Sequence, residues 1–311
     1  MLGRHRDRLL QDGWHIAKTG QIAEGEDLPE ATEGGSFLPG PRLVHHPISW
    51  GLQRRVDVAC PSPETIAALL AAEFALHPRI ILTTECFYWE NRDIAQITAL
   101  KNLLPDGARV LCWLRNRFEH IESLYSQAVF DHAFQGSVMD FYSTHEVAFD
   151  YGAMLSQWTN TFGTGQVECR IYNSRLNPFI SFLESLGLDA HRYESEALVI
   201  NRSVPPALAP VLRAVVAPDS IKKSLAFRMK QVVDKMPKCR LLRAGDVGRI
   251  LQTTEPGDAF LRELGVDVGP IRDPALYLSK PHVNEVMPDA TAKGLAALLM
   301  TDESITRAAP R

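Results

Sequence analysis

The sequence has no apolar run that approaches the about 20 residues needed by a membrane-spanning helix. Its opening segment, MLGRHRDRLLQDG, is basic, but no apolar core follows it as in a secretory signal. No internal repeat is visible either. We therefore expect neither a membrane span nor a secretory signal in this chain, and no repeat architecture.

Cysteine and net charge are also scarce. The five cysteines, at positions 60, 86, 112, 169 and 239, form no C-x-x-C pair and no cluster with metal-ligand spacing, so no metal is expected. An odd number of scattered cysteines fits a reducing compartment, which predicts a cytoplasmic location. Cys112 and Cys169 fall in predicted strands, where a small buried apolar residue is the expected role. The net charge of −4 favours binding to neither nucleic acid nor a membrane surface.

What is present is an ordinary globular composition, together with segments that predict strands and helices. The chain of 311 residues is 45% hydrophobic and 23% charged. Apolar segments predict strands at Arg79–Thr84, Arg109–Leu114 and Gln166–Tyr172. Helical patterns alternate with them, and the first of these has Ser62 as its predicted N-cap. This alternation favours a parallel sheet flanked by helices on both faces.

The pattern changes near residue 205. We predict an α/β core over residues 1–205, a mostly helical extension packed on it over 206–300, and a tail over 301–311. Residues 222–243 carry eight basic side chains and one acid, Asp234. They fit either an anion-facing lid or a solvated helix face.

The most informative segment is ARVLCWLRNRFEHIESLYSQAVF, residues 108–130. An unbroken apolar run predicts a strand that ends at Arg115, and an amphipathic helix follows with Ser123 on its polar face. A strand that ends in arginine, followed by a helix start with its positive dipole end, is a ready anion site. Such a pair also occurs on ordinary protein surfaces.

The surrounding segments carry a resemblance to a known family. RIILTTECF, residues 108–130, DYGAMLSQWTNTFG, QVECRIYN and NPFISFLESLGL, in this order, resemble the bacterial branch of the sulfotransferases that use PAPS, 3′-phosphoadenosine-5′-phosphosulfate. The resemblance covers roughly residues 1–205 and implies a P-loop-type α/β core with PAPS as co-substrate. In that family an arginine and a serine at this spacing bind the 3′-phosphate, which gives those roles to Arg115 and Ser123.

The resembled family also holds the 5′-phosphosulfate in a K-T-G-T-T-type loop after its first strand. Lys18-Thr19-Gly20 follows a polar, helix-like segment and precedes an acidic one, so we interpret it as a chance match. The better alignment sets residues 4–20 against the helix and turn after that loop. The sequence is then N-terminally truncated relative to the family, either through a misassigned start codon, which we favour, or as a degenerate member.

An acceptor hydroxyl needs a general base within hydrogen-bond reach. Glu85, at the end of the Arg79–Thr84 strand, is the first candidate, with a structural carboxylate as the alternative. His46 is the second, because a histidine pair resembles one in this bacterial branch. Its neighbour His45 is expected to be a helix-start or buried histidine.

The leading prediction is a sulfotransferase-like protein that transfers a sulfuryl group from PAPS to a hydroxyl of a carbohydrate or another small acceptor. The rival is a non-catalytic relic that binds nucleotide or a protein partner. A metal-dependent nucleotide-sugar enzyme is disfavoured because the sequence has no D-x-D motif.

Overall fold

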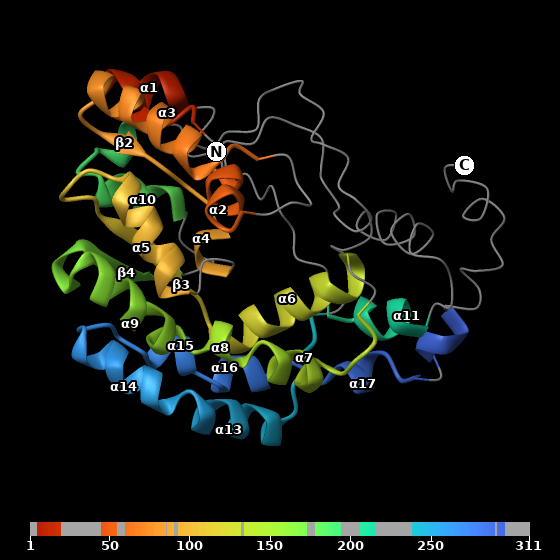
Figure 1. Ribbon diagram of the computed structural model, residues 1–311. Coiled ribbons are helices and arrows are strands. Elements are labelled where there is room, and N and C mark those ends of the chain that lie inside the picture. Colours follow the sequence, from red (N-terminus) through yellow and green to blue (C-terminus); the bar gives the residue numbers. More distant parts are fainter. Residues whose placement is uncertain are drawn as a thin grey trace, which may run out of the picture. The chain divides into compact units, whose positions relative to one another are not determined.

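A computed structural model describes residues 5–19, 45–54, 60–84, 86–89, 93–131, 134–172, 178–193, 206–214, 238–289 and 291–295 (Figure 1). The chain divides into two compact units that alternate along the sequence. The first unit comprises residues 1–33, 37–113 and 153–198, and the second comprises residues 34–36, 114–152 and 199–311. The predicted division near residues 205 and 300 stays a prediction.

The first unit holds the strands. Its elements are α1 (Arg6–Gln11), β1 (His15–Ile16), α2 (His46–Leu52), α3 (Pro63–Leu76), β2 (Ile80–Ile81), α4 (Cys86–Trp89), α5 (Ile94–Leu103), β3 (Val110–Leu114), most of α9 (Tyr151–Phe162), the 3-10 turn η2 (Thr164–Gln166), β4 (Val167–Ile171), α10 (Pro178–Ser185) and the 3-10 turn η3 (Ala190–Arg192). The N-cap Ser62 accepts a hydrogen bond from the Thr65 N–H, as predicted.

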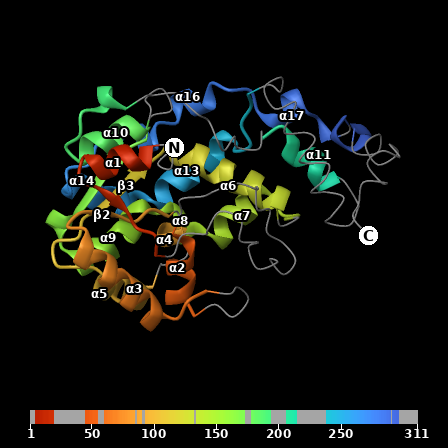
Figure 2. The ribbon, with the colours of Figure 1, turned by 90° about the horizontal axis from the view of Figure 1, so that it is seen from above.

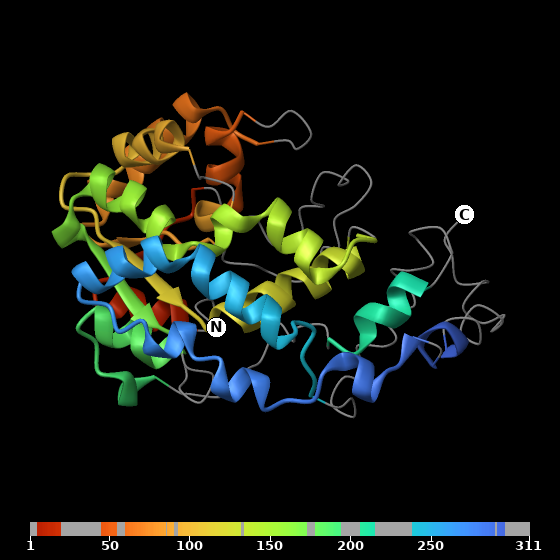
Figure 3. The same cartoon turned by 90° about the horizontal axis from the view of Figure 1, so that it is seen from below.

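The strands of this unit lie between two layers of helices. Figures 2 and 3 show α1 and α10 on one side of the strands and α3 and α5 on the other. Helix α10 packs on both strand pairs. Its Phe179 and Leu183 join a buried cluster with Ile16 and Ile81, and its Ser181 accepts a hydrogen bond from the Trp113 indole. The mixed α/β class is therefore confirmed.

The strands form two separate pairs, not one sheet, in the part of the chain that the structure describes. β1 pairs in parallel with β2, and β3 pairs with β4. The predicted strand Arg79–Thr84 is reduced to Ile80–Ile81 because Thr83 bonds to a helix start instead. Its carbonyl accepts from the His45 N–H, and its own N–H donates to the His45 ring. The His45 side chain thus ends the β1–β2 pairing at a position where the apolar sequence pattern predicts that the strand continues.

The second unit is helical. Its elements are α6 (Arg117–Asp131), α7 (Val138–Thr144), α8 (Glu146–Phe149), α11 (Leu208–Ala214), α13 (Ala244–Thr253), α14 (Glu255–Glu263), α15 (Gly269–Arg272), α16 (Ala275–Leu278) and α17 (Val283–Val286). In Figures 1 and 3, α13 and α14 run end to end beside α7 and α8. The predicted apolar stripe of α6 is buried at Phe118, Ile121, Tyr125 and Val129.

Two glycines let the chain segment at the start of α9 touch α14 directly. A Cβ on Gly152 would overlap the backbone of Gly257, and a Cβ on Gly257 would overlap the carboxyl group of Asp150. The absence of side chains at both positions therefore fixes how closely these segments approach within the second unit.

Gly152→Ala is expected to lower the free energy of unfolding by about 1–3 kcal/mol, because its methyl group would overlap the backbone of Gly257, which cannot turn aside as a side chain can. Gly248→Ala is the matched control, since Gly248 is an exposed α13 residue with open space where a methyl group would lie. Alanine favours a helix by about 1 kcal/mol over glycine, so the control should gain stability. Urea unfolding measures both, and equal changes in the two variants would contradict the close approach.

Candidate functional site

The candidate site lies at the start of α6, where the structure has the predicted strand followed by a helix. β3 ends at Leu114, and α6 begins at Arg117. Between them, the Asn116 side-chain oxygen accepts the Glu119 N–H at 3.3 Å, which caps the first turn. The amide nitrogen of Asn116 donates to the carbonyl oxygen of Asp273 at 3.0 Å. The start of α6 is thereby tied to the segment between α15 and α16.

Arg115 is the half-exposed cation of this site. Its side chain is 31% exposed, and its Nη2 lies 3.9 Å from Oε2 of Glu119. The Nε of Arg115 is buried without a hydrogen-bond partner among the described residues. Because the side chain is partly exposed, Arg115 can offer the N–H donors of its two terminal nitrogens to an anion, whereas the buried Nε lies out of reach.

Glu119 places a carboxylate beside this cation. Its Oε1 accepts a hydrogen bond from the Lys280 ammonium at 2.9 Å, and its other oxygen faces Arg115. Lys280 follows α16, so a second cation reaches the site from a distant part of the chain. An anion that binds Arg115 must compete with the carboxylate of Glu119.

Ser123 lies one helical turn beyond Glu119 on the same face of α6 and is half-buried. His120, on the adjoining face, has its Nδ1 2.8 Å from the Tyr151 hydroxyl. Burial, together with the charge of Arg115, lowers the pKa of His120 to about 3. His120 is therefore neutral at pH 7, and the positive charge of the site comes from Arg115 and Lys280.

Arg117, two residues after Arg115, has a different environment. It is fully buried and forms a two-pronged ion pair with Asp258, with nitrogen–oxygen distances of 3.0 and 2.5 Å. Its Nε donates to the Phe149 carbonyl at 2.8 Å, and its guanidinium lies 5.2 Å from the centre of the Tyr151 ring. Because nothing reaches it from outside, Arg117 holds α6 against α8 and α14 and is not available to a ligand.

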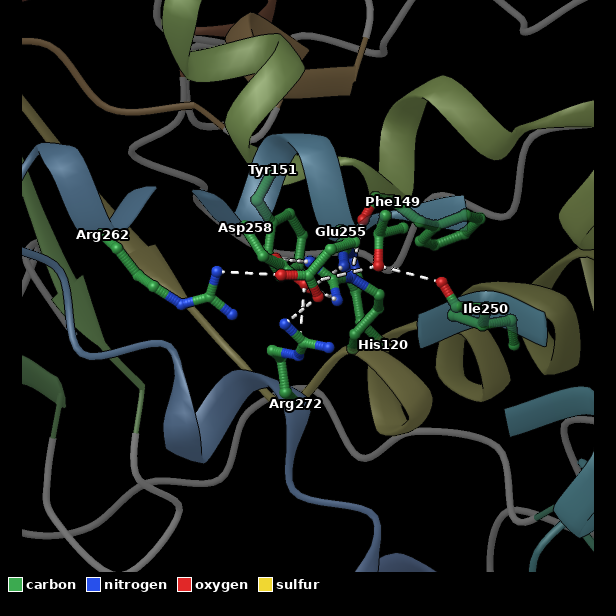
Figure 4. Close-up of polar contacts among 10 residues, drawn as sticks. His120, Phe149, Tyr151, Ile250, Glu255, Asp258, Arg262 and Arg272 are labelled. Atoms are coloured by element: carbon green, nitrogen blue, oxygen red, sulfur yellow. Dashed lines mark hydrogen bonds and ion pairs between the residues drawn. The ribbon is translucent and has the colours of Figure 1, made fainter. Parts of the chain in front are cut away.

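The Asp258 end of this pair continues into a charged network (Figure 4). Arg272 lies 3.5 Å from Asp258 through its Nε and also contacts Glu255. Glu255 accepts in turn from Arg262 at 2.9 Å. A chain of alternating charges thus runs from the buried Arg117–Asp258 pair to the half-exposed Glu255 and Arg262.

Glu122 is a second buried charge-bearing group on α6. It is 4% exposed, and its Oε1 accepts from the Leu241 N–H and the Tyr277 hydroxyl. Burial raises the pKa of Glu122 to about 7, although these bonds and the charge of Lys280 oppose the rise. The hydroxyl of Tyr277 also accepts the Leu242 N–H at 3.0 Å. Glu122 therefore anchors the 241–242 segment to α6.

Lys18 and Thr19, in the first unit, bind an internal carboxylate. A short strand, β1, precedes them, which the sequence did not predict. The N–H groups of Lys18 and Thr19 donate to the Glu73 carboxylate at 2.8 and 2.6 Å, and His15 Nε2 lies 2.8 Å from it. Burial raises the pKa of Glu73, but the hydrogen bonds outweigh burial and keep it below its usual value. These amides are already occupied.

The two predicted bases stay predictions. Glu85 lies outside the described residues, as does the side chain of His46, whose backbone begins α2. The expectation for His45 is confirmed. It is fully buried, with Nδ1 2.9 Å from the Thr83 nitrogen and Nε2 3.0 Å from the Ala17 carbonyl. Burial lowers the pKa of His45, so it is a structural, neutral histidine.

Most of the basic stretch 222–243 also lies outside the described residues, which resume at Lys238. Arg240 donates to the carbonyl oxygens of Lys280 and Leu242 at 2.9 and 2.6 Å. This guanidinium therefore supports the chain around Lys280.

The described residues contain no group of three or more side chains that would hold a metal ion. Within the same residues no helix has the length and apolar character to cross a membrane.

Sequence reasoning missed Lys280, Asp258 and Glu122. Lys280 and Asp258 lie far from α6 in the sequence, so no local spacing connects them with it. Glu122 carried one signal, a carboxyl group directly beside the buried Ile121 on an amphipathic helix.

No family model matches the chain, and no solved structure matches it. A stretch of 126 residues, 38% of this chain, is 32% identical to a protein of Archaeoglobus fulgidus whose name is "Uncharacterized protein". The chain spans 33% of the length of that relative. Its name states no activity.

Asp258→Ala is expected to lower the free energy of unfolding by about 3–5 kcal/mol, because it leaves the buried charge of Arg117 without its partner. The double variant Arg117→Met/Asp258→Leu should regain much of this loss, since it removes both charges. Denaturant unfolding of the parent and both variants measures the difference. A loss below about 1 kcal/mol in Asp258→Ala would contradict the structural role given to the pair.

Glu122→Gln tests the raised pKa of Glu122. The unfolded carboxyl loses its proton near pH 4.5, whereas the folded one keeps it up to about pH 7. Between these values the folded state binds more protons, so the stability of the parent falls as pH rises and levels off above about 7. The fall is on the order of 3 kcal/mol.

The glutamine variant has no titrating group at this position, so its stability curve should lack this fall. Urea unfolding from about pH 4 to about pH 8 compares the two proteins. Parallel curves would show that Glu122 ionises normally in the folded state.

Proposed function

We propose that this chain is a sulfotransferase-like protein that uses PAPS, with a P-loop-type α/β core, and that Arg115 and Ser123 bind the 3′-phosphate of the nucleotide. The observation that carries the proposal is the position of Arg115. Its guanidinium lies 3.9 Å from Glu119, which is one helical turn before Ser123 on the same face of α6, and its Nε has no hydrogen-bond partner in the described part of the chain.

The charges at this site fit a phosphate group. Arg115 offers a planar set of donors, which phosphate oxygens can accept in pairs. The start of α6 adds the positive end of a helix dipole, and Lys280 adds a second cation. Glu119 opposes the ligand, because its carboxylate repels phosphate and pairs with both cations. A phosphate that takes over these cations leaves Glu119 to solvent, where its side chain is already 37% exposed.

Sulfuryl transfer to a hydroxyl needs a base and a phosphate leaving group. The acceptor loses its proton to the base while its oxygen bonds to sulfur, and the bond between sulfur and the bridging phosphate oxygen breaks. Glu85 is the first candidate for the base and His46 the second, both from the family resemblance. A carbohydrate or another small hydroxyl compound is the proposed acceptor.

A second candidate function is nucleotide binding without transfer. One observation favours it: the N–H groups of Lys18 and Thr19, in the single K-T-G of this sequence, bind Glu73. Those amides are not open to a phosphosulfate while that contact is made. In this alternative the Arg115 site keeps its ligand, and the sulfuryl group is not transferred.

Titration calorimetry with 3′-phosphoadenosine-5′-phosphate tests the site. Arg115→Ala is expected to weaken binding about 10- to 100-fold, because hydrogen bonds to a charged group contribute about 1.5–3 kcal/mol. Glu119→Gln should strengthen binding about fivefold, since it removes a competing carboxylate worth up to about 1 kcal/mol.

Arg109→Ala is the matched control. Arg109 is a 53% exposed arginine of the first unit that pairs with Glu168, so its loss should leave binding unchanged. Equal affinity of the parent and Arg115→Ala would refute the site. If the site holds, release of 3′-phosphoadenosine-5′-phosphate from PAPS with hydroxyl acceptors separates the two candidate functions, because the non-catalytic protein releases none.

A further inference from the structure

Two cysteines of the first unit face each other across a strand pair. Cys112 lies in the middle of β3, and Cys169 lies in the middle of the neighbouring strand β4. Their sulfur atoms are 3.2 Å apart, and neither is in a disulfide. The S–S bond of a disulfide is about 2.05 Å long, so a movement of about 1 Å would suffice to form one.

The two sulfurs lie on the same face of this strand pair. Successive side chains in a strand alternate between faces. Trp113 and Arg170, the neighbours of the two cysteines, both hydrogen-bond to Ser181 of α10. Cys112 and Cys169 therefore point to the opposite face. Both residues are half-buried, so neither is fully enclosed in the core.

The contact between the sulfurs makes them chemically unequal. The Cys112 thiol donates its hydrogen to the sulfur of Cys169. This hydrogen bond lowers the pKa of Cys169, against the effects of burial and of the Glu168 charge. The same bond, with burial, raises the pKa of Cys112. Cys169 is thus the thiol that ionises first, and a thiolate is the nucleophile in disulfide exchange.

We propose that Cys112 and Cys169 form a reversible dithiol–disulfide pair that low-molecular-weight disulfides oxidise. The Cys169 thiolate attacks one sulfur of glutathione disulfide and releases one glutathione thiolate. The Cys112 thiol then loses its proton, attacks the Cys169 sulfur and releases the second glutathione. Two electrons pass from the protein to the oxidant, and a β3–β4 cross-link remains. This site is independent of the proposed function.

The test treats the native chain with glutathione disulfide, removes the reagent, and labels the remaining thiols with N-ethylmaleimide after unfolding. The parent should take up label at three of its five cysteines and lose two hydrogen atoms by intact mass. Peptide mapping should find Cys112 joined to Cys169, and dithiothreitol should restore all five thiols.

Serine variants separate the roles of the two thiols. Cys112→Ser should stop at a mixed disulfide of Cys169 with glutathione, whereas Cys169→Ser should react far more slowly. Cys60→Ser is the control, because Cys60 is half-buried like the pair and should not affect the cross-link. The parent peptide map decides the matter even if a serine variant fails to fold. Five labelled thiols in the treated native parent, or a cross-link to another cysteine, would overturn the proposal.

Discussion

The Arg117–Asp258 ion pair is the constraint on which the second unit depends. Both side chains are completely buried, and a charge in such a place is stable only when it is paired and fully hydrogen-bonded. Asp258 supplies both oxygens, Phe149 supplies a carbonyl, and Arg272 lies 3.5 Å from Asp258 as a second cation. The register of α6 against α8 and α14 is set by this requirement. The position of Arg115 follows, because it lies two residues before the tethered arginine.

A nine-residue stretch, 115–123, therefore combines two kinds of contact. The half-exposed residues form the candidate anion site, whereas Arg117 and Glu122 bind partners inside the unit. The segment around α16 touches both sets, since Lys280 bonds to Glu119 and Tyr277 bonds to Glu122. A change in charge in the anion site can therefore affect the buried residues, and the reverse, through the segment around α16.

The sequence predicted the structure correctly where the contacts that determine it are between residues close together in the chain. The helix start at Ser62 depends on a residue three positions away, and the apolar stripe of α6 depends on helical spacing. It did not predict the structure where a residue far away in the sequence determines the end of a strand or the composition of the site. His45 shortens the β2 ladder, and Lys280 enters the candidate site, although no sequence pattern connects His45 with β2 or Lys280 with α6. The roles of Glu85 and His46 rest on the resemblance.

The contact between Glu73 and the segment after β1 has a consequence for motif searches. A Lys-Thr-Gly string is read as a place for a nucleotide because its amides are assumed to face an external anion. Here the carboxylate of Glu73 accepts hydrogen bonds from the Lys18 and Thr19 amides, so these residues connect the end of β1 to α3. The same sequence motif can thus bind a carboxylate of its own chain or an external anion. Only the atoms bonded to its amides show which of the two applies.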